Sequence, residues 1–291
     1  YGDHRDLHSF PTRRSSDLRE NFTQPEIRRS NLAGLLLMMA AADMGPVERF
    51  PFLEPPTDRG ISAARRHLTE LGALSQEGEI TPLRRDMARL PVDPHLARMI
   101  LAARTEGVLE DVTIIATGLS ISDPREIPSD RRDEARLKQQ PFTDVSSDFL
   151  TLLRLWTAYH GQLERLRTQN KMRNFCREHF LSYPRMREWS DLHAQTIIAL
   201  KRIGCSAPRN PQPDPDAIHR SVLAGLPTHV ARRDEEKKNF RTALGREAFI
   251  FPGSVLGKKA PPWIVCHEFV ETTRLFGRTV AQIDPDWIER M

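Results

Sequence analysis

The sequence predicts a multidomain, mostly α-helical protein in which a winged helix and a helical bundle precede a small β-barrel of the OB-fold type. Three observations predict this order: two amphipathic helices with a short hairpin come first, a long stretch with apolar residues at helical spacing follows, and short β-type runs come last. We place the winged helix at 19–90, the helical bundle at 91–206, a linker at 207–218 and the barrel at 219–291.

The first residues do not fit this pattern. The stretch from His8 to Leu18, HSFPTRRSSDL, has neither helical nor strand periodicity and reads like the translation of a sequencing-adapter oligonucleotide. We interpret residues 1–18 as a sequence artefact; a disordered tail is the alternative. If they are an artefact, the sequence is a fragment of a longer protein.

Composition limits the possible functions. The chain has 291 residues, a net charge of +4 and 28% charged residues, which is typical of a globular protein that can bind nucleic acid without requiring it. Its three cysteines are widely separated and form no C-x-x-C pair, which excludes a zinc ribbon and favours the reducing cytoplasm. No apolar run reaches the roughly 18 residues that span a bilayer, so we expect no membrane partner.

The winged helix is predicted from capping and spacing. Thr23 and Glu26 form a capping box for a first helix, with Pro25 early in it, and Gly45-Pro46 ends that helix. A second helix runs from Ile61 to Leu71. Residues 73–75 and 79–81 then flank a turn at Gly78, which completes the pattern.

The bundle and the barrel differ in periodicity. Helical spacing covers residues 96–103 and 108–119, a charged loop is expected from 130 to 140, and an apolar stripe continues from Ser147 to Gly204. Four prolines between 208 and 215 indicate a linker. Short β-type runs at 249–251, 263–265, 270–273 and 279–281 predict the barrel.

No catalytic centre is evident in the sequence. The run Gly253-Ser-Val-Leu-Gly257-Lys258-Lys259 resembles a phosphate-binding loop, but its spacer is one residue short and Lys259 stands where Ser or Thr would hold magnesium. The histidines lack partners at metal-ligand spacing. We therefore predict no catalytic residue and no metal site in this chain.

Basic residues gather in the barrel. Between Ala231 and Ala260 there are eight Lys or Arg and four Asp or Glu, a local net charge of +4. The eight could follow a phosphate backbone, with Phe240, Phe249 and Phe251 as stacking surfaces. The alternative is a solvated face over core aromatics. The eight are Arg232, Arg233, Lys237, Lys238, Arg241, Arg246, Lys258 and Lys259.

Several strings resemble the C-terminal region of DEAH-box RNA helicases, most closely the bacterial HrpA type. They cover about residues 19–291, and their order and spacing make the resemblance specific. The strings include Thr23-x-Pro25-Glu26-Ile27, Leu90-Pro91-Val92-Asp93-Pro94, Leu119-Ser120-Ile121-x-Asp123-Pro124-Arg125-Glu126, Arg185-Met186-Arg187-Glu188-Trp189 and Ile250-Phe251-Pro252-Gly253-Ser254. One departure is Arg84, where the family usually has glycine, and it predicts a relaxed turn at the end of the wing.

The resemblance implies a role. In that family a winged helix, a ratchet bundle and an OB-fold follow two motor domains that bind ATP and Mg²⁺ and hydrolyse the nucleotide; this fragment would hold no cofactor. The implied partners are single-stranded RNA, the missing motor domains and a regulatory or ribosome-associated protein. The implied RNA contacts are the eight barrel residues and four ratchet arginines. For the arginines, the alternative is a solvated surface position or ion pairing with Glu178 and Glu188 at helical spacing. The four are Arg173, Arg177, Arg185 and Arg187.

Two other functions stay open from the sequence. The chain could be a stand-alone RNA- or protein-binding module without ATPase activity. It could also be a DNA-binding winged-helix regulator, for which Arg65, Arg66 and His67 would supply a weakly basic recognition helix.

Overall fold

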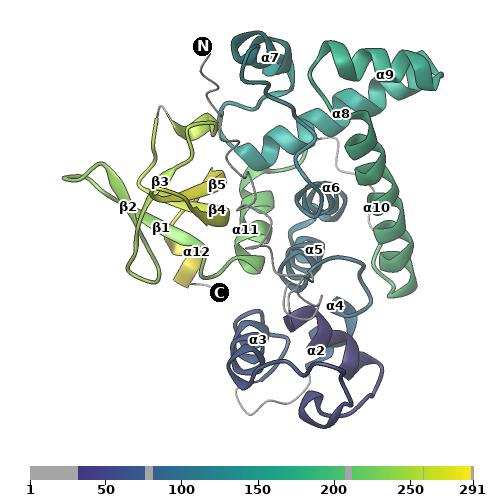
Figure 1. Ribbon diagram of the computed structural model, residues 1–291, viewed down its shortest axis with the longest axis vertical. Helices are drawn as coiled ribbons and strands as arrows, with labels where there is room; N and C mark the ends of the chain where they lie inside the picture. The colour runs from purple at the N-terminus through teal and green to yellow at the C-terminus, as the bar shows by residue number, and fades with distance from the viewer. Residues whose placement is uncertain (1–31, 76–80, 207–211, 258, 290–291) are drawn as a thin grey trace, which may run out of the picture.

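A computed structural model describes residues 32–75, 81–206, 212–257 and 259–289. The winged-helix elements lie at one end, the helical bundle occupies the middle and the other end, and the barrel packs against one side of the bundle (Figure 1). The predicted order of a mostly helical part followed by a small barrel is confirmed.

The winged helix contains α2 (Leu32–Ala41), η1 (Val47–Arg49), α3 (Asp58–Glu70) and α4 (Pro82–Met87). Two threonines cap its helices: Thr57 accepts a hydrogen bond from the amide of Gly60, and Thr81 caps α4. The amide of Thr81 donates to the carbonyl of Ala73 over 3.4 Å, so the two flanks of the predicted hairpin lie together. The predicted helix start at Thr23 and the turn at Gly78 lie outside the described residues.

Arg84 does not form the relaxed turn that we predicted. It lies in the first turn of α4, where its amide donates to Thr81 Oγ1 over 3.3 Å. Its Nη2 donates to the carbonyl of Leu36 on α2 over 3.3 Å. The prediction was wrong because helix α4 begins directly after Thr81, so the backbone at Arg84 is helical and needs no glycine.

The bundle contains α5 (Pro94–Glu106), α6 (Leu109–Leu119), α7 (Arg132–Gln139), η2 (Gln140–Phe142), α8 (Asp148–Leu166), α9 (Gln169–Glu178) and α10 (Tyr183–Arg202). The predicted charged loop at 130–140 is wrong, because α7 forms there. Two residues attach this helix to the bundle: Ala135 is fully buried, and Gln139 Nε2 donates to the carbonyl of Phe180 over 2.9 Å. Charged residues on its remaining faces concealed the helical period.

Two glycines let helices approach closely in the bundle. Trp189 of α10 is fully buried over Gly118 of α6, and its Nε1 donates to the carbonyl of Ile114 over 3.0 Å. Helix α11 (Pro215–Gly225) begins inside the predicted linker and packs on α5. There a Cβ added to Gly225 would lie 2.2 Å from the carbonyl oxygen of His95.

The barrel contains β1 (Val230–Asp234), β2 (Asn239–Thr242), β3 (Glu247–Ile250), η3 (Val255–Gly257), β4 (Trp263–Glu271), β5 (Leu275–Gln282) and then α12 (Asp286–Glu289). The strands close in the order β1-β2-β3-β5-β4, with β3 and β5 parallel and the other pairs antiparallel. This closed five-stranded barrel confirms the predicted OB-fold. Strands β1 and β2 were not predicted, because VARRD and NFRT carry charges rather than an apolar run.

One apolar core joins the three parts. It runs from Ala33 and Leu37 on α2 through the bundle and α11 to Val265 and Ala281 of the barrel, while a second, smaller cluster fills the barrel around Phe240 and Ile264. In the part of the chain that the structure describes, no helix combines the length and apolar character needed to cross a membrane.

Replacing Gly225 by alanine should destabilise the protein by about 1–3 kcal/mol, because the new methyl group meets the backbone of α5, which cannot yield cheaply. The matched control is Gly161→Ala on α8, where nothing lies within 4 Å of the added carbon. That substitution should stabilise by up to about 1 kcal/mol. Urea unfolding of both variants measures the difference; equal stability of the two would contradict the close contact.

Candidate nucleic-acid interface

A buried carboxylate joins the bundle to the barrel. Asp148, at the start of α8, is 6% exposed. Its Oδ1 accepts a hydrogen bond from the amide of Val255 over 3.0 Å, and its Oδ2 accepts one from the amide of Val280 over 2.8 Å. Both barrel segments are thus held by one side chain, whose negative charge also suits the amino end of a helix.

The residue before it strengthens this joint. Ser147 caps α8 by accepting from the amide of Phe149, and its backbone forms a β-bridge with Ala281 of β5. His219 of α11 lies 2.9 Å from Ser147 Oγ through its Nε2. Burial lowers the pKa of His219 to about 4, so its ring is neutral at neutral pH. Helices α8 and α11 and the barrel therefore meet in one polar cluster.

A cleft opens beside this joint, between the loop after α6 and the barrel. It has a volume of about 540 Å³ and lies against Arg125, Phe251, Gly253, Glu268 and Arg278, among others. Phe251 is 38% exposed. The guanidinium of Arg278 lies over the Phe251 ring, 4.8 Å from its centroid, and 3.6 Å from Glu268. A flat ring covered by a guanidinium is a surface on which a base can stack.

The opposite wall of the cleft is held by an ion pair. Arg125 donates to Asp123 through Nε over 3.0 Å and through Nη2 over 2.8 Å, while Arg185 Nη1 donates to the carbonyl of Asp123 over 2.9 Å. Burial opposes ionisation of Asp123, but Arg125 outweighs it and holds the pKa of that carboxyl below its usual range. This wall is rigid and charged.

The carboxylates beside the cleft already have hydrogen-bond partners. The carboxylates of Asp123 and Asp148 are already engaged, and among the described residues no group of three or more His, Cys, Asp or Glu could hold a metal ion. The run Gly253–Gly257 leads through η3 into β4, not into the long helix that follows a phosphate-binding loop.

The predicted barrel cations lie mainly on the β1–β2 hairpin. Arg232 and Arg241 are exposed and directly opposite one another across β1 and β2. Three others already have partners: Lys237 bonds to Glu247 over 3.1 Å, Arg246 to Glu271 over 2.7 Å, and Arg233 to the carbonyl of Ala260 over 2.8 Å. Lys238 and Lys259 are exposed, and Lys258 lies outside the described residues.

The predicted aromatic surfaces divide into two groups. Phe240 is 3% exposed and belongs to the barrel core, so its prediction as a stacking surface is wrong. Phe249 and Phe251 project outward instead. Residue type alone could not separate them, because the choice depends on which face of its strand each occupies.

The predicted bundle cations do not form one group. Arg185 donates to Asp123 beside the cleft. The guanidinium of Arg173 instead lies 5.4 Å from the centroid of the Tyr183 ring, and Arg177 donates to Asn174 over 2.5 Å. A hydrogen bond that Arg187 donates to the side chain of Tyr183 raises the pKa of Arg187. Within the described ranges, none of the four forms an ion pair with Glu178 or Glu188.

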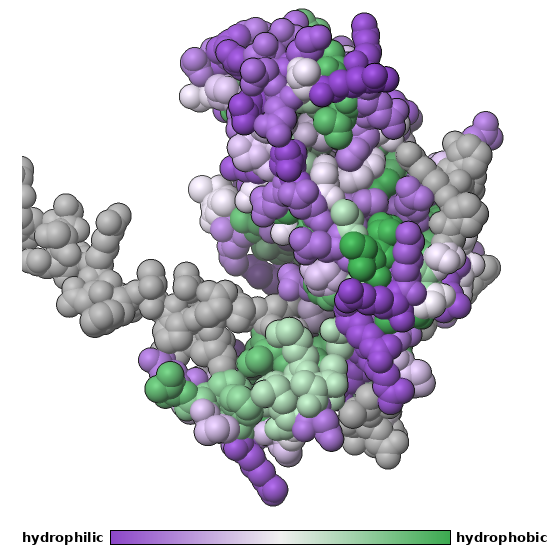
Figure 2. Space-filling view, turned by 90° about the vertical axis from the view of Figure 1, so that its right-hand side faces the viewer, coloured by the Kyte–Doolittle hydropathy of each residue, from purple (hydrophilic) through white to green (hydrophobic). Residues whose placement is uncertain are grey.

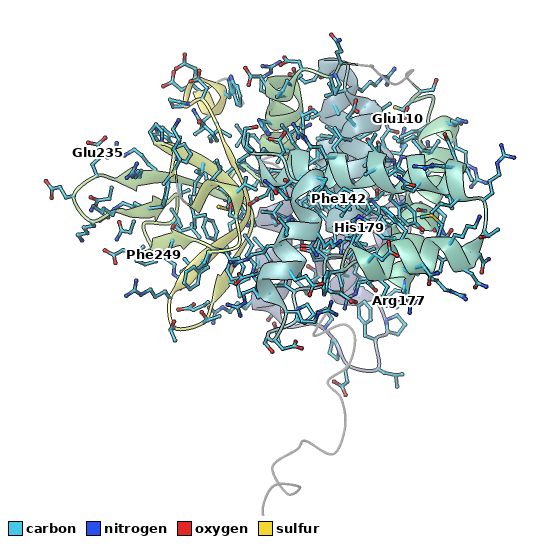
Figure 3. All side chains as sticks on the ribbon, turned by 90° about the horizontal axis from the view of Figure 1, so that it is seen from above. Glu110, Phe142, Arg177, His179, Glu235 and Phe249 are labelled. Carbon is cyan, nitrogen blue, oxygen red and sulfur yellow. The ribbon has the colours of Figure 1, made fainter. Side chains whose placement is uncertain are left out.

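The β1–β2 hairpin and helix α9 lie on opposite sides of the molecule. Figure 3 shows Glu235, at the tip of the β1–β2 hairpin, on one side and Arg177 of α9 on the other. Sequence reasoning missed Arg125 and Arg278, which lie between them at the cleft. The only signal for Arg125 was its place in the Asp123–Glu126 string, and Arg278 precedes a predicted strand without any motif.

Histidines gather where the winged helix, the bundle and the barrel meet. The rings of His95 on α5 and His267 on β4 lie 5.6 Å apart, and His229 Nδ1 lies 2.8 Å from the carbonyl of His267. Burial, then the nearby imidazoles, lower the pKa of His95 to about 3 and that of His267 to about 4. Both rings are therefore neutral in the folded protein near neutral pH.

Comparison with known protein families finds three matches in chain order. Residues 64–92 match the winged-helix part of the helicase-associated domain (HA2), residues 93–152 match its ratchet-like part, and residues 218–291 match the oligonucleotide/oligosaccharide-binding (OB)-fold.

Curated relatives are similar over nearly the whole chain. It is 42% identical over 277 residues to the ATP-dependent RNA helicase HrpA of Escherichia coli (strain K12), covering 93% of this chain and 21% of that protein. It is 40% identical to the ATP-dependent RNA helicase HrpA homolog of Haemophilus influenzae, and the match covers 93% of this chain and 21% of that protein. It is 30% identical to the pre-mRNA-splicing factor ATP-dependent RNA helicase prp22 of Schizosaccharomyces pombe, and the match covers 91% of this chain and 22% of that protein. The chain spans about a fifth of the length of these relatives.

Replacing Asp148 by asparagine should loosen the joint. An amide keeps one acceptor but presents a donor to the second barrel amide, which costs about 1–3 kcal/mol. Amide hydrogen exchange should speed up at Val255 and Val280 while the amides of α5 stay protected. Asp133→Asn, at an exposed position on α7, is the control. Unchanged exchange at both valines would contradict the joint.

Stability should fall with acid in a defined window. The folded protein holds His95 and His267 neutral, whereas the unfolded chain takes up protons near the ordinary pKa of 6.5. The two histidines should therefore leave the free energy of unfolding undiminished above about pH 6.5, and this free energy should decrease as the pH falls toward 4. A His95→Gln, His267→Gln variant should show a flatter pH dependence in denaturant titrations; an identical slope would argue against the burial of these rings.

Proposed function

Because this chain belongs to the helicase-associated family, with winged-helix, ratchet-like and OB-fold units in that order, we propose that it is the C-terminal accessory part of a DEAH-box, ATP-dependent RNA helicase. The motor domains, with the ATP and Mg²⁺ sites that make the parent protein a hydrolase, belong to the remaining length of the protein. The three cysteines are free and buried, which supports a cytoplasmic setting.

We propose that the accessory part binds single-stranded RNA in the cleft between the bundle and the barrel. The observation that carries this proposal is the cleft itself, with Phe251 and Arg278 on one wall and the Arg125–Asp123 pair on the other. Because Asp148 fastens the barrel to α8 of the bundle, the bundle and the barrel would move as one body when the motors open and close. Stepwise movement of the motors, 3′ to 5′, would then carry RNA past a fixed grip.

The apolar surface of the winged helix supports the proposal that another domain of the same protein packs on it. Figure 2 shows apolar residues gathered at the lower end of the molecule, over these elements. Helix α2 has no polar side chain, and Met38 on it is 59% exposed. Relatives are about five times longer than this chain, so we propose that the motor domains cover this surface.

A stand-alone RNA- or protein-binding module is the second candidate. It would use the same cleft, and only ATP hydrolysis by the parent protein separates the two functions. Expression of the gene with its upstream reading frame, followed by an RNA-stimulated ATPase assay, decides between them. A DNA-binding regulator is less favoured, because Arg65 on α3 is paired with Glu48 and so does not present a free charge to a groove.

Reversing two exposed cations tests whether the barrel contacts RNA. The Arg232→Glu, Arg241→Glu variant should bind a labelled single-stranded RNA more weakly, because two facing charges would repel the phosphates. The slope of log affinity against log salt should also become shallower, by about 1.4 for two lost phosphate contacts. Fluorescence anisotropy at several salt concentrations measures both.

The control carries the same change in net charge elsewhere. Arg59→Glu with Arg66→Glu alters two exposed arginines on α3, away from the barrel. If this control weakens binding as much as the barrel variant, the effect comes from net charge alone and the β1–β2 hairpin does not contact RNA.

A further inference from the structure

A strip of aromatic and arginine side chains covers the outer face of β3 and β5. Side chains alternate between the two faces of a strand, so Phe276 and Arg278 share the outer face of β5, and the exposed Arg274 directly precedes this strand. The residues between them, Leu275 and Gly277, are buried.

Strand β3 and its continuation contribute the other two rings. Phe249 and Phe251 face outward, whereas Ala248 is 1% exposed on the inner face. The parallel pairing sets Phe249 directly beside Phe276. Five side chains from two strands and the residues next to them therefore form one strip, which we call the β3–β5 strip; they are Phe249, Phe251, Arg274, Phe276 and Arg278. Figure 3 shows Phe249 on the outside of the barrel.

Each member of the strip contacts the next. The guanidinium of Arg274 lies 4.8 Å from the centroid of the Phe249 ring, which lies 6.2 Å from that of Phe276. The Phe276 ring in turn lies 6.2 Å from Phe251, edge-on at 90°. Arg278 covers Phe251 at 4.8 Å. The order along the strip is thus arginine, ring, ring, ring, arginine.

The charges of the strip are only partly neutralised. The carboxylate nearest to Arg278, Glu268, is 3.6 Å away, while Glu271 is occupied by Arg246 over 2.7 Å. The exposed Phe251 ring lies in the wall of the cleft, so the strip leads from the open barrel surface into the cleft. The strip has apolar rings for the flat faces of bases and a guanidinium at each end for phosphates.

We propose that the β3–β5 strip is a stacking site for the bases of single-stranded nucleic acid, and that it rather than the β1–β2 hairpin provides most of the barrel's affinity. This rests on the proposed RNA-binding function. At the rise of an extended chain, the five residues from Arg274 to Arg278 span about 13 Å. This length suits the short end of single-strand sites on OB-folds, about 4 nucleotides. Duplexes hide their base faces, so the strip would reject them.

Ring removal tests the stack in the full 291-residue chain. Phe251→Ala should weaken binding of a single-stranded oligo(U) RNA about tenfold, as loss of one stacked base predicts. The salt dependence of the affinity should stay unchanged, because no charge is lost. Phe251→Tyr keeps the ring and should bind as the parent chain does, which separates stacking from misfolding. Leu163→Ala, at an apolar position of similar exposure on α8, is the matched control.

The arginines are tested at constant charge. Arg278→Lys keeps the cation but loses the flat guanidinium, and should weaken binding by about threefold or more. Arg131→Lys is matched, since Arg131 also lies 4.8 Å from a ring centroid, that of Phe180, outside the strip. A 2-aminopurine base in the RNA should lose fluorescence on binding to the parent chain and less so on binding to Phe251→Ala.

The outcomes separate the two proposals. If the parent chain binds RNA and both strip variants bind equally well, the strip is not the site although RNA binding stands. If the parent chain binds no single-stranded RNA, both proposals fail. Tight binding of an apolar peptide at the strip, with no RNA competition, would make it a protein-docking surface and overturn the stacking site.

Discussion

The arrangement of the whole molecule depends on the carboxylate of Asp148. A buried charge is costly unless it is well paired, and here both oxygens accept from barrel amides that lie 107 and 132 residues further along the chain. Two bonds from one rigid helix end fix the barrel in position and orientation. Apolar contacts between bundle and barrel are not directional, so they alone would allow sliding. The polar joint sets where the cleft opens.

The opposite wall is fixed by the same kind of interaction. The loop after α6 is tied to the segment between α9 and α10, because the amide of Glu126 donates to the carbonyl of Phe180 and the amide of Ser182 donates to the carbonyl of Pro124, each over 2.8 Å. Arg125 and Arg185 then hold Asp123 from two sides. A cleft with two braced walls keeps its shape before a ligand enters, which reduces the entropy that binding must overcome.

The sequence predicted what depends on local periodicity and missed what depends on distance. Helices α5 and α6 and the OB-fold followed from apolar spacing, whereas α7, β1 and β2 were hidden by charged residues. The cleft could not be predicted, because its walls come from segments more than a hundred residues apart. Strand register also had to be known before buried Phe240 could be distinguished from outward-facing Phe249.

Local net charge does not show which basic side chains are available to a ligand, because it ignores the acceptors that already pair with them inside the barrel. Of the basic side chains in the barrel, Lys237, Arg246 and Arg233 already bond to acceptors within the barrel, so contacts to phosphates would first have to break those bonds. The two arginines of the β3–β5 strip lie over aromatic faces, and of these two Arg278 also lies 3.6 Å from a carboxylate, that of Glu268. A guanidinium over a ring can still donate through its edge. Under the proposed function, an RNA strand that reaches the cleft from the barrel side would therefore meet aromatic surfaces first, and the geometry of the rings rather than the number of cations would determine where it binds.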